Sequence, residues 1–288
     1  MPAGLVLIDK PQGFTSHDVV AKLRKKLGTK KIGHAGTLDP MATGLLVLGV
    51  DSGTKLLTFL VGVDKTYEAR IRLGQATVSD DAEGEILSET SALHLNLATI
   101  EAELSKLRGP ISQAPSAVSA IKVDGKRAYD LVREGKSVEL KSREVEVSRF
   151  EITSEIEIVD QYLEFDVVVD CSSGTYIRAL ARDLGAALGV GGHLRALRRT
   201  RVGGYLISDA SQLDQDPVVI DLTEAASKVF PLCELNSEQA VDLVHGKRIN
   251  LDRTGNLCAT YRGKLIGILE PAGVSYKSLV VFPEVLNG

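Results

Sequence analysis

Two strand-like segments that follow each other closely limit the possible folds most strongly. Residues 145–158 and residues 162–171 alternate apolar and polar side chains, and only a short polar link that contains Asp160 and Gln161 separates them. Alternation with a period of two is typical of a strand with one buried face. Because so short a link joins antiparallel strands, we expect an antiparallel meander within a sheet.

Other segments add further strands and a few helices. Residues 4–10, 45–50 and 66–73 are short apolar or alternating runs that predict strands. Thr15 and Asp18 form a capping-box pattern in front of an apolar repeat with helical spacing. Helices are also expected over residues 100–107, 129–134 and 176–188. We therefore expect an α+β fold in which helices and loops flank a mixed, largely antiparallel central sheet.

A change in composition near Phe230 and Pro231 predicts a domain boundary. Residues 209–216, which precede it, are polar and acidic. After it, short strand-like runs separated by glycines cover residues 257–261, 264–269 and 279–282. We expect one domain over residues 1–229 and a small β-rich domain over residues 230–288, which is near the lower size limit for independent folding.

The composition excludes several classes of protein. The chain has 288 residues, with 44% hydrophobic and 25% charged side chains, which is typical of a globular protein and not of a disordered one. No stretch approaches the roughly 18 uncharged apolar residues of a membrane span. The three cysteines lie far apart without a CxxC pair, which argues against a cysteine-rich zinc site and favours the reducing cytoplasm.

The charges are distributed unevenly along the chain. The formal net charge is −4, yet residues 1–50 hold seven basic and three acidic side chains, and residues 172–204 hold six arginines and one acid. Two basic blocks in an acidic body could line a groove for a polyanion, because the local field steers a ligand more than the total charge does. Taken alone, either block is explained equally well as a solvated helix face.

One loop combines several features of a catalytic site. Residues 33–44 place a single carboxylate, Asp39, among three glycines and next to Pro40. Glycine permits backbone conformations and close approaches that other residues do not, and proline keeps the preceding residue out of the helical region. Asp39 is therefore a candidate for chemistry on a constrained loop. The alternative is an Asx turn, in which the carboxylate only caps its own loop.

A second candidate is Arg178, near the start of the helix expected over residues 176–188. The helix dipole opposes a cation at this end, so another group must compensate, and a buried carboxylate is the obvious choice. Arg178 and Arg182 are four residues apart and share one face of this helix. An ordinary surface arginine is the alternative.

The common cofactor and hydrolase motifs are missing from the sequence. It contains no GxxxxGK[ST] phosphate loop, no GxGxxG after a strand, no GxSxG and no HExxH. We therefore expect a site that uses neither a cofactor nor a metal ion.

Taken in order along the chain, these segments resemble the TruB family of tRNA pseudouridine synthases. The blocks that carry the resemblance are LVLIDKPQGFTSHDVV at residues 5–20, GHAGTLDPMATGLLVLGV at 33–50, KTYEARIRLG at 65–74, SQAPSAVSAIKVDGKRAYDLVREG at 112–135, CSSGTYIRALARDLG at 171–185 and GGHLRALRRTRVGGY at 191–205. The family often has two consecutive prolines in the fourth block, whereas here Pro115 is followed by Ser116. The resemblance implies a pseudouridine synthase fold, with a PUA-like RNA-binding domain at the C-terminus.

The resemblance also implies the reaction and its catalytic residues. Uridine 55 in the TΨC loop of tRNA is flipped out of its stack, its N-glycosidic bond is broken, and a C–C glycosidic bond is formed without a cofactor. Asp39 matches the catalytic aspartate of the family. Arg178 matches the active-site arginine, which would pair with Asp39 and keep it ionised. Tyr67 matches the tyrosine that packs on the uracil.

Further residues match positions that the family uses around the substrate. His34 matches the histidine that fills the space of the flipped base, and Leu197 matches an apolar residue of the pocket. Lys10 matches a lysine of the first motif and is expected to support the structure more than to contact phosphate. Tyr176 is a further stacking candidate. The two basic blocks would bind phosphates, with Lys30, Lys31 and Arg199 among them.

Two other functions stay open at this point. The first is an RNA-guided subunit of an H/ACA particle, with the same chemistry but a partner-dependent substrate; the short N-terminus and the lack of basic tails favour a stand-alone enzyme. The second is a non-catalytic module that binds or folds tRNA, and the intact set of Asp39, Tyr67 and Arg178 argues against it. We expect a cytoplasmic monomer that acts on tRNA without an obligate protein partner or a membrane.

Overall fold

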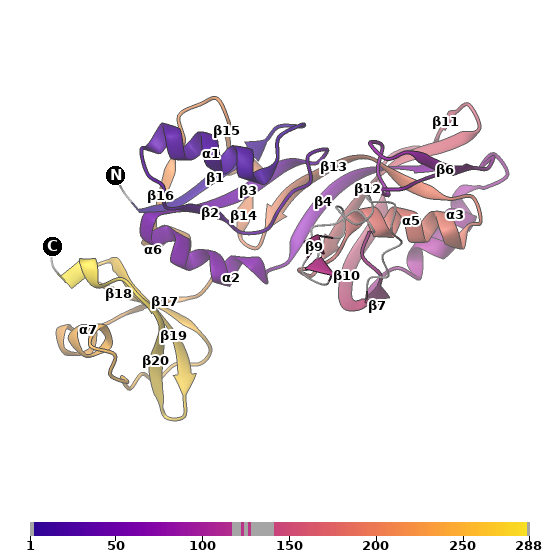
Figure 1. The fold of residues 1–288 in the computed structure, drawn as a ribbon. Helices are drawn as coiled ribbons and strands as arrows, with labels where there is room; N and C mark the ends of the chain where they lie inside the picture. The colour runs from indigo at the N-terminus through magenta and orange to yellow at the C-terminus, as the bar shows by residue number, and fades with distance from the viewer. Residues whose placement is uncertain (1–2, 117–121, 124–125, 128–140, 287–288) are drawn as a thin grey trace. The chain divides into compact units, whose positions relative to one another are not determined.

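The computed structural model describes residues 3–116, 122–123, 126–127 and 141–286 (Figure 1). The chain forms two compact units. The first unit contains Met1–Pro40, Gly44–Val61 and Val202–Gly288, and the second contains Met41–Thr43 and Gly62–Arg201. The helix expected over residues 129–134 lies outside the described residues.

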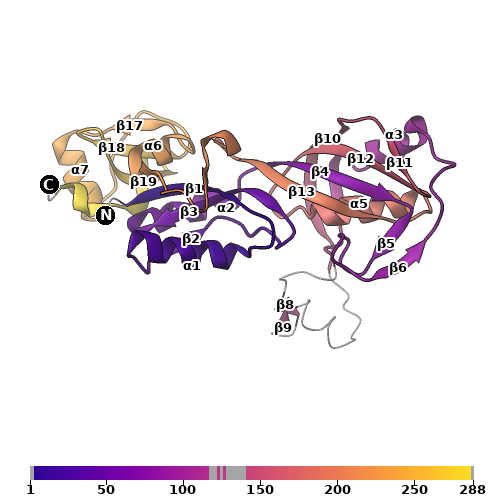
Figure 2. The ribbon, with the colours of Figure 1, turned by 90° about the horizontal axis from the view of Figure 1, so that it is seen from above.

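A small sheet forms the N-terminal part of the first unit (Figure 2). β1 (Gly4–Lys10) pairs antiparallel with β3 (Thr43–Val50), so that Gly4 faces Val50 and Lys10 faces Gly44. The short strand β2 (Ile32–His34) also pairs antiparallel with β3. β15 (Ser211–Gln212) and β16 (Val219–Asp221) pair with β1 in parallel and antiparallel direction, respectively.

One amphipathic helix, α1 (Ser16–Leu27), packs on this sheet. The capping box between Thr15 and Asp18 begins the helix, and Gly28 ends it in the left-handed conformation, at a φ of 62°, so the predicted start is confirmed. The apolar side chains of α1 and of the sheet form one core, which contains Val6, Ile8, Val19, Val20, Leu23, Leu27, Leu46, Leu48 and Val50. The helical spacing of the apolar residues therefore leaves the cations of α1 on its solvent side.

A second sheet, formed after residue 230, completes the first unit. Its strands have the order β17 (Leu232–Glu234), β18 (Leu257–Tyr261), β19 (Lys264–Ala272) and β20 (Ser275–Val281), with β17 and β18 parallel and the other pairs antiparallel. α7 (Ser237–Val244) begins at a capping box of Asn236 and Gln239, and η3 (Pro283–Leu286) follows β20. The strands predicted over residues 257–261 and 264–269 are confirmed.

Helix α6 (Leu222–Ser227) connects the two sheets of the first unit. The Leu265 amide donates to the Thr223 hydroxyl at 2.9 Å, and the Cys258 thiol donates to the Ala226 carbonyl oxygen at 3.1 Å. The short elements of this unit that remain are η1 (Asp51–Leu56), α2 (Leu57–Val61), β14 (Tyr205–Leu206) and η2 (Ile207–Asp209).

The second unit is built on a larger sheet. Its strands have the order β13 (Gly192–Val202), β4 (Lys65–Leu73), β12 (Tyr162–Cys171), β10 (Arg143–Ile152) and β7 (Gly109–Gln113). The pairs β4–β12, β12–β10 and β10–β7 are antiparallel. The predicted meander is confirmed: β11 (Glu157–Val159) and β12 form a hairpin whose loop is Asp160 and Gln161. The arginine-rich residues 194–205, which the sequence pattern left unassigned, lie mostly in β13.

Helices and hairpins complete the second unit. α3 (Leu97–Ser105) and α5 (Ile177–Ala187) pack against each other and contact β10 and β4, respectively. α3 begins earlier than predicted because the Asn96 side chain accepts a hydrogen bond from the Thr99 amide and caps the helix. β5 (Gln75–Thr77) pairs with β6 (Ile86–Glu89), and β8 (Lys122–Val123) with β9 (Lys126–Arg127). Throughout the described ranges, every helix is too short or too polar to cross a membrane.

Candidate active site

The loop that carries Asp39 is fixed on both sides of this residue. The buried Ser16 hydroxyl accepts a hydrogen bond from the Leu38 amide at 2.9 Å and donates one to the Leu38 carbonyl oxygen at 3.2 Å. The Pro40 carbonyl oxygen accepts a hydrogen bond from the Gly13 amide at 2.9 Å. Both neighbours of Asp39 are thus held by the segment that leads into α1, and the half-buried Asp39 lies on a preorganised loop.

Lys10 supports the same loop. Its side chain has no exposed surface, and its Nζ donates to the carbonyl oxygens of Phe14 at 2.6 Å, Pro11 at 3.1 Å and Pro40 at 3.4 Å. A buried ammonium needs such acceptors to offset its lost hydration. Lys10 is thus held inside the protein against the loop that contains Pro40.

Two histidines meet where this loop begins. His34, the last residue of β2, and His17, in the first turn of α1, pack edge to face, with 5.7 Å between ring centroids and 86° between ring planes. His17 is exposed and His34 is half-buried. The start of α1 therefore contacts the loop through both Ser16 and His17.

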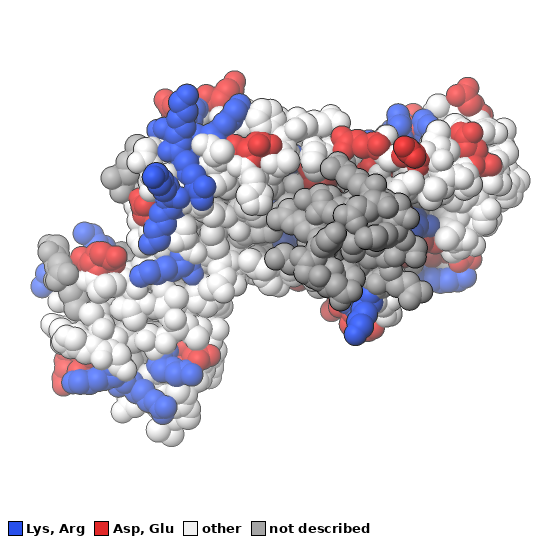
Figure 3. All heavy atoms as spheres, viewed as in Figure 1, with Lys and Arg blue, Asp and Glu red and all other residues white. Residues whose placement is uncertain are grey.

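The first basic block forms an exposed surface on α1 and the residues after it. Figure 3 shows lysine and arginine atoms gathered over the region where Figure 1 draws α1. The exposed cations there are Lys22, Arg24, Lys25, Lys26, Lys30 and Lys31, and together they are called the α1 surface below. Two of them also contact backbone: Arg24 donates to the Ile32 carbonyl oxygen at 3.0 Å, and Lys26 donates to that of Asp214 at 2.6 Å.

In the second unit, Tyr67 lies on the buried face of β4. Lys65, Tyr67, Ala69 and Ile71 alternate with more exposed residues, and only 8% of the Tyr67 side chain is exposed. Burial, and next the nearby Arg199 guanidinium, lower the pKa of Lys65 to about 8. The buried face of β4 therefore carries an aromatic ring close to a buried amine.

The predicted residues of β13 are buried as well. Leu197 and Arg199 are 7% and 1% exposed. An apolar position at Leu197 agrees with a pocket residue. Arg199 does not lie on an open surface, because the arginine-rich segment is a strand with one inward face.

Arg178 is buried near the N-terminus of α5, with 5% of its surface exposed. Its Nη1 donates to the Ser79 carbonyl oxygen at 2.7 Å and to Asp81 Oδ2 at 3.1 Å. A carboxylate therefore does compensate Arg178, as the helix dipole required, but it comes from a residue that the sequence analysis missed. Asp81 lies 97 positions away in the sequence, and the only local signal is a pair of acids in the turn between β5 and β6.

Tyr176, the residue before α5, is fixed through its backbone. The Tyr176 amide donates to Gln113 Oε1 at 2.8 Å, and Gln113 Nε2 donates to the Tyr176 carbonyl oxygen at 3.1 Å. Its ring lies 5.8 Å from the Arg143 guanidinium. Tyr176 is half-buried.

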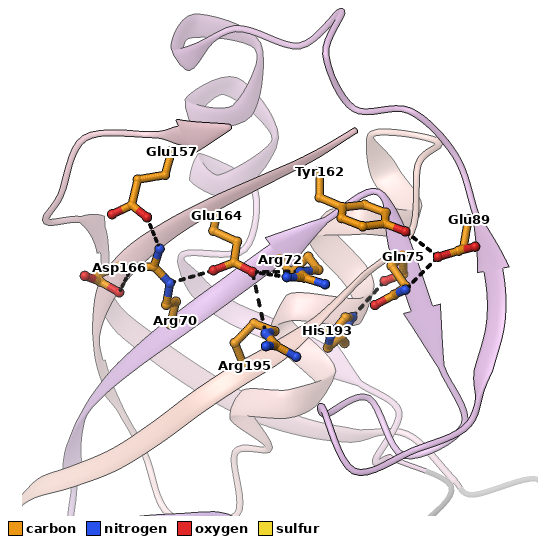
Figure 4. Close-up of polar contacts among 10 residues, drawn as sticks. All are labelled: Arg70, Arg72, Gln75, Glu89, Glu157, Tyr162, Glu164, Asp166, His193 and Arg195. Carbon is orange, nitrogen blue, oxygen red and sulfur yellow. Dashed lines mark hydrogen bonds and ion pairs between the residues drawn. The ribbon is translucent and has the colours of Figure 1, made fainter. Parts of the chain in front are cut away.

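A separate polar cluster engages part of the second basic block (Figure 4). Glu164 accepts hydrogen bonds from Arg70 Nε at 2.8 Å and Arg72 Nε at 2.7 Å, and Arg195 Nε lies 3.5 Å from it. Burial raises the pKa of Glu164, but the Arg70 and Arg72 guanidiniums outweigh it and hold this pKa below its usual value. Arg201 donates to the Thr66 hydroxyl at 2.8 Å and lies 3.5 Å from Asp170. In the second basic block, Arg195 and Arg201 therefore each lie close to a carboxylate of the protein itself.

Acidic, cysteine and histidine side chains do not gather in metal-binding groups of three or more within the part of the chain that the structure describes. The chemistry that these residues offer is therefore a carboxylate on a fixed loop, a buried guanidinium bound to a second carboxylate, and a tyrosine ring on a sheet face.

Known proteins with the same architecture define the class. A solved structure described as a Cbf5–Nop10–Gar1 complex has a TM-score of 0.69 to this chain at 23% identity, covering 96% of this chain and 84% of the other. A box H/ACA Nop10–Cbf5 complex gives a TM-score of 0.67 at 21% identity, over 96% and 85%. The fold is thus that of the pseudouridine synthases.

The sequence comparisons define the family. Residues 24–177 match the TruB family pseudouridylate synthase N-terminal domain, and residues 178–219 match the tRNA pseudouridylate synthase B C-terminal domain. Relatives named tRNA pseudouridine synthase B include one from Leifsonia xyli, 54% identical over 98% of this chain and 97% of its own length, and one from Mycolicibacterium paratuberculosis, 50% identical over 97% of each. The chain belongs to the TruB family of pseudouridylate synthases and is a pseudouridine-forming isomerase.

Proposed function

We propose that this enzyme converts uridine 55 in the TΨC loop of tRNA to pseudouridine, with Asp39 as the catalytic carboxylate. The choice of substrate rests on the match to a relative named tRNA pseudouridine synthase B, which is 54% identical over 97% of its own length. The fixed loop around Asp39 supports the choice of residue. The enzyme acts as a cytoplasmic monomer, without a cofactor or an obligate protein partner.

The reaction is an isomerisation, so atoms and electrons balance within the substrate. The bond from the ribose C1′ to the uracil N1 breaks, the uracil turns, and a bond from C1′ to C5 forms. The proton on C5 leaves to solvent, and N1 gains one. Asp39, ionised, stabilises or attacks the electron-poor centre that develops as the first bond breaks. Arg178 is the active-site arginine, and its guanidinium favours negative charge in its surroundings.

The uridine must leave its stack before it reacts, which costs about a few kcal/mol. Stacking on an aromatic ring returns about 1–3 kcal/mol per base. Tyr67 supplies this ring from the buried face of β4, and Leu197 adds apolar contact. His34 fills the space that the base leaves in the RNA loop.

The direct test uses purified enzyme and an unmodified tRNA transcript, with no guide RNA, protein or metal added. The expected product is one pseudouridine, at position 55, found by chemical mapping of the RNA. A matched transcript with cytidine at position 55 is expected to stay unmodified. Pseudouridine at another position, or none at all, would reject the proposed substrate.

An RNA-guided enzyme is the second candidate, because the solved structures with the same fold include complexes named for H/ACA particles. Their identity to this chain is 22% and 21%, whereas a relative named tRNA pseudouridine synthase B is 54% identical. Activity in the reaction without guide RNA distinguishes the two functions, since a guided enzyme would be inactive there.

The loop around Asp39 depends on Ser16, which gives a first prediction. Ser16→Ala removes both hydrogen bonds to Leu38 and is expected to lower turnover at saturating tRNA about tenfold, because catalytic groups lose activity when they are held loosely. Steady-state kinetics measures kcat and KM separately. The control is Thr29→Ala, which removes a hydrogen bond from the Thr29 hydroxyl to Asp51 Oδ1, 2.8 Å long and outside this loop. Equal kcat for Ser16→Ala and wild type would contradict the role of Ser16.

The α1 surface gives a second prediction. Lys30→Gln combined with Lys31→Gln is expected to weaken tRNA binding about fivefold near 0.1 M salt and to reduce the slope of log Kd against log salt concentration by about 2, because two phosphate contacts are lost. Turnover at saturating tRNA is expected to stay unchanged. Filter binding at several salt concentrations measures the slope. The control is Lys106→Gln at the C-cap of α3, where the lysine pairs with Glu103 at 2.7 Å. An equal effect of this substitution on tRNA binding would show that only the loss of net charge matters.

A further inference from the structure

Two adjacent aspartates bind two arginines on successive turns of α5. Arg178 Nη1 lies 3.1 Å from Asp81 Oδ2, and one turn later Arg182 Nη1 lies 3.3 Å from Asp80 Oδ2. Neighbouring side chains of an extended chain point to opposite sides. Asp80 has a φ of 59°, in the left-handed region, and this turn of the backbone lets both carboxylates face the same helix. Aspartate is among the few residues other than glycine that adopt this conformation readily.

Arg182 also holds a third segment of the chain. Its Nη2 donates to the Ala114 carbonyl oxygen at 2.7 Å, and its Nη1 donates to that of Pro115 at 3.4 Å. The two hydrogen bonds between Gln113 and Tyr176 fix the same segment to the start of α5. The Arg182 guanidinium, which belongs to α5, therefore contacts two other segments. These are the segment that follows β7 and the turn between β5 and β6.

The pair between Asp80 and Arg182 is partly shielded from water. The side chain of Asp80 is 9% exposed and that of Arg182 is 29% exposed. Burial raises the pKa of Asp80, and the Ser116 hydroxyl, followed by the Arg182 and Arg178 guanidiniums, opposes this rise. A buried carboxylate that loses its cation disturbs its surroundings more than an exposed one does. Asp80 lies between Ser79 and Asp81 in the sequence. Ser79 and Asp81 are the residues that accept hydrogen bonds from the Arg178 guanidinium.

We propose that Asp80 and Arg182 are positioning residues for Arg178. The pair fixes the turn at residues 79–81 against α5, so that the Ser79 carbonyl oxygen and the Asp81 carboxylate hold Arg178 in the geometry needed for isomerisation. Neither residue touches the substrate; both act through Arg178. The inference rests on the proposed function only in taking Arg178 to be part of the active site.

The kinetic test compares Asp80→Asn and Arg182→Met with wild type on an unmodified tRNA transcript. Asparagine keeps the size of aspartate and tolerates its backbone conformation. Both variants are expected to lower turnover at saturating tRNA about tenfold, with the Kd for tRNA changed less than twofold. The matched control is Asp183→Asn, which removes another carboxylate bound to Arg182, at 2.8 Å, and is expected to leave turnover within twofold.

Combining the substitutions separates positioning from a general loss of stability. In an Arg178→Lys background, Asp80→Asn is expected to lower turnover less than twofold further, because its effect passes through Arg178. The same tenfold loss in both backgrounds would overturn the proposal. So would a wild-type turnover in Asp80→Asn and Arg182→Met.

A measurement without RNA tests the proposal even if the proposed substrate is wrong. Arginine side-chain NMR of the free enzyme follows the exchange of the Arg178 guanidinium protons with water. Asp80→Asn is expected to speed this exchange about tenfold, and Asp183→Asn to leave it unchanged. Unchanged exchange in Asp80→Asn would overturn the proposal by itself. Failure of the proposed function would instead appear as an inactive wild type with the expected NMR effect intact.

Discussion

In the Asp39→Asn variant, turnover is expected to fall at least about 10⁴-fold while tRNA still binds. Asparagine has nearly the same shape and keeps the loop contacts of Leu38 and Pro40, which involve backbone atoms and not the Asp39 side chain. It cannot carry the negative charge that the breaking glycosidic bond requires. Single-turnover assays with enzyme in excess measure the chemical step, and the Kd for tRNA is expected to change less than about threefold.

The control for this substitution is Asp209→Asn, which changes a 45% exposed aspartate of η2 in the same unit. It is expected to react at the wild-type rate. If Asp39→Asn retains a rate within tenfold of wild type, Asp39 is not the catalytic carboxylate. If binding is lost together with turnover, the carboxylate contributes to recognition and the assignment to chemistry alone is wrong.

The second large effect is expected for the Arg178→Lys variant, whose turnover should be about 100-fold lower than that of wild type. Lysine keeps the positive charge, but it cannot reproduce the planar guanidinium that donates to Ser79 and Asp81. A 100-fold loss corresponds to about 2.7 kcal/mol of transition-state stabilisation. Rapid-quench kinetics at saturating enzyme measures the rate.

Asp81→Asn provides the matched comparison. It removes the carboxylate that is 3.1 Å from Arg178 and is expected to lower the rate to a similar degree. The double variant is expected to be little slower than either single variant, since both changes remove the same interaction. Fully additive losses would show that Arg178 and Asp81 act separately. Denaturant unfolding of each variant checks that the midpoint stays close to that of wild type.

Local patterns in the sequence predicted the parts of the fold that local forces determine. The capping box of Thr15 and Asp18 starts α1 as expected, because the partners lie three residues apart. The two-residue link at Asp160 forms the turn of a hairpin, and this residue adopts the left-handed conformation that such a turn needs. The loop around Asp39 was recognisable because glycine and proline restrict its backbone in known ways.

Contacts between distant segments could not be predicted in the same way. The helix dipole indicated that Arg178 needs a carboxylate, but not that Asp81 supplies it from 97 positions away. The arginine-rich residues 195–201 suggested a phosphate-binding surface. Their place in β13 buries Arg199 and pairs Arg195 with Glu164, a partner that only the order of the strands reveals. The cations of the first basic block are exposed on the α1 surface, whereas Arg199 of the second block is buried, and charge along the chain does not distinguish these two cases.

The most direct measurement follows the hydrogen on C5 of the target uracil. An unmodified tRNA transcript that carries tritium at this position in its uridines is mixed with purified enzyme and a metal chelator, without any further component. Because the new bond forms at C5, the enzyme is predicted to release the tritium of one uridine per tRNA into water, and a transcript with cytidine at position 55 is predicted to release none. No release from the first transcript, or equal release from both, would contradict the proposal that this chain alone isomerises that uridine.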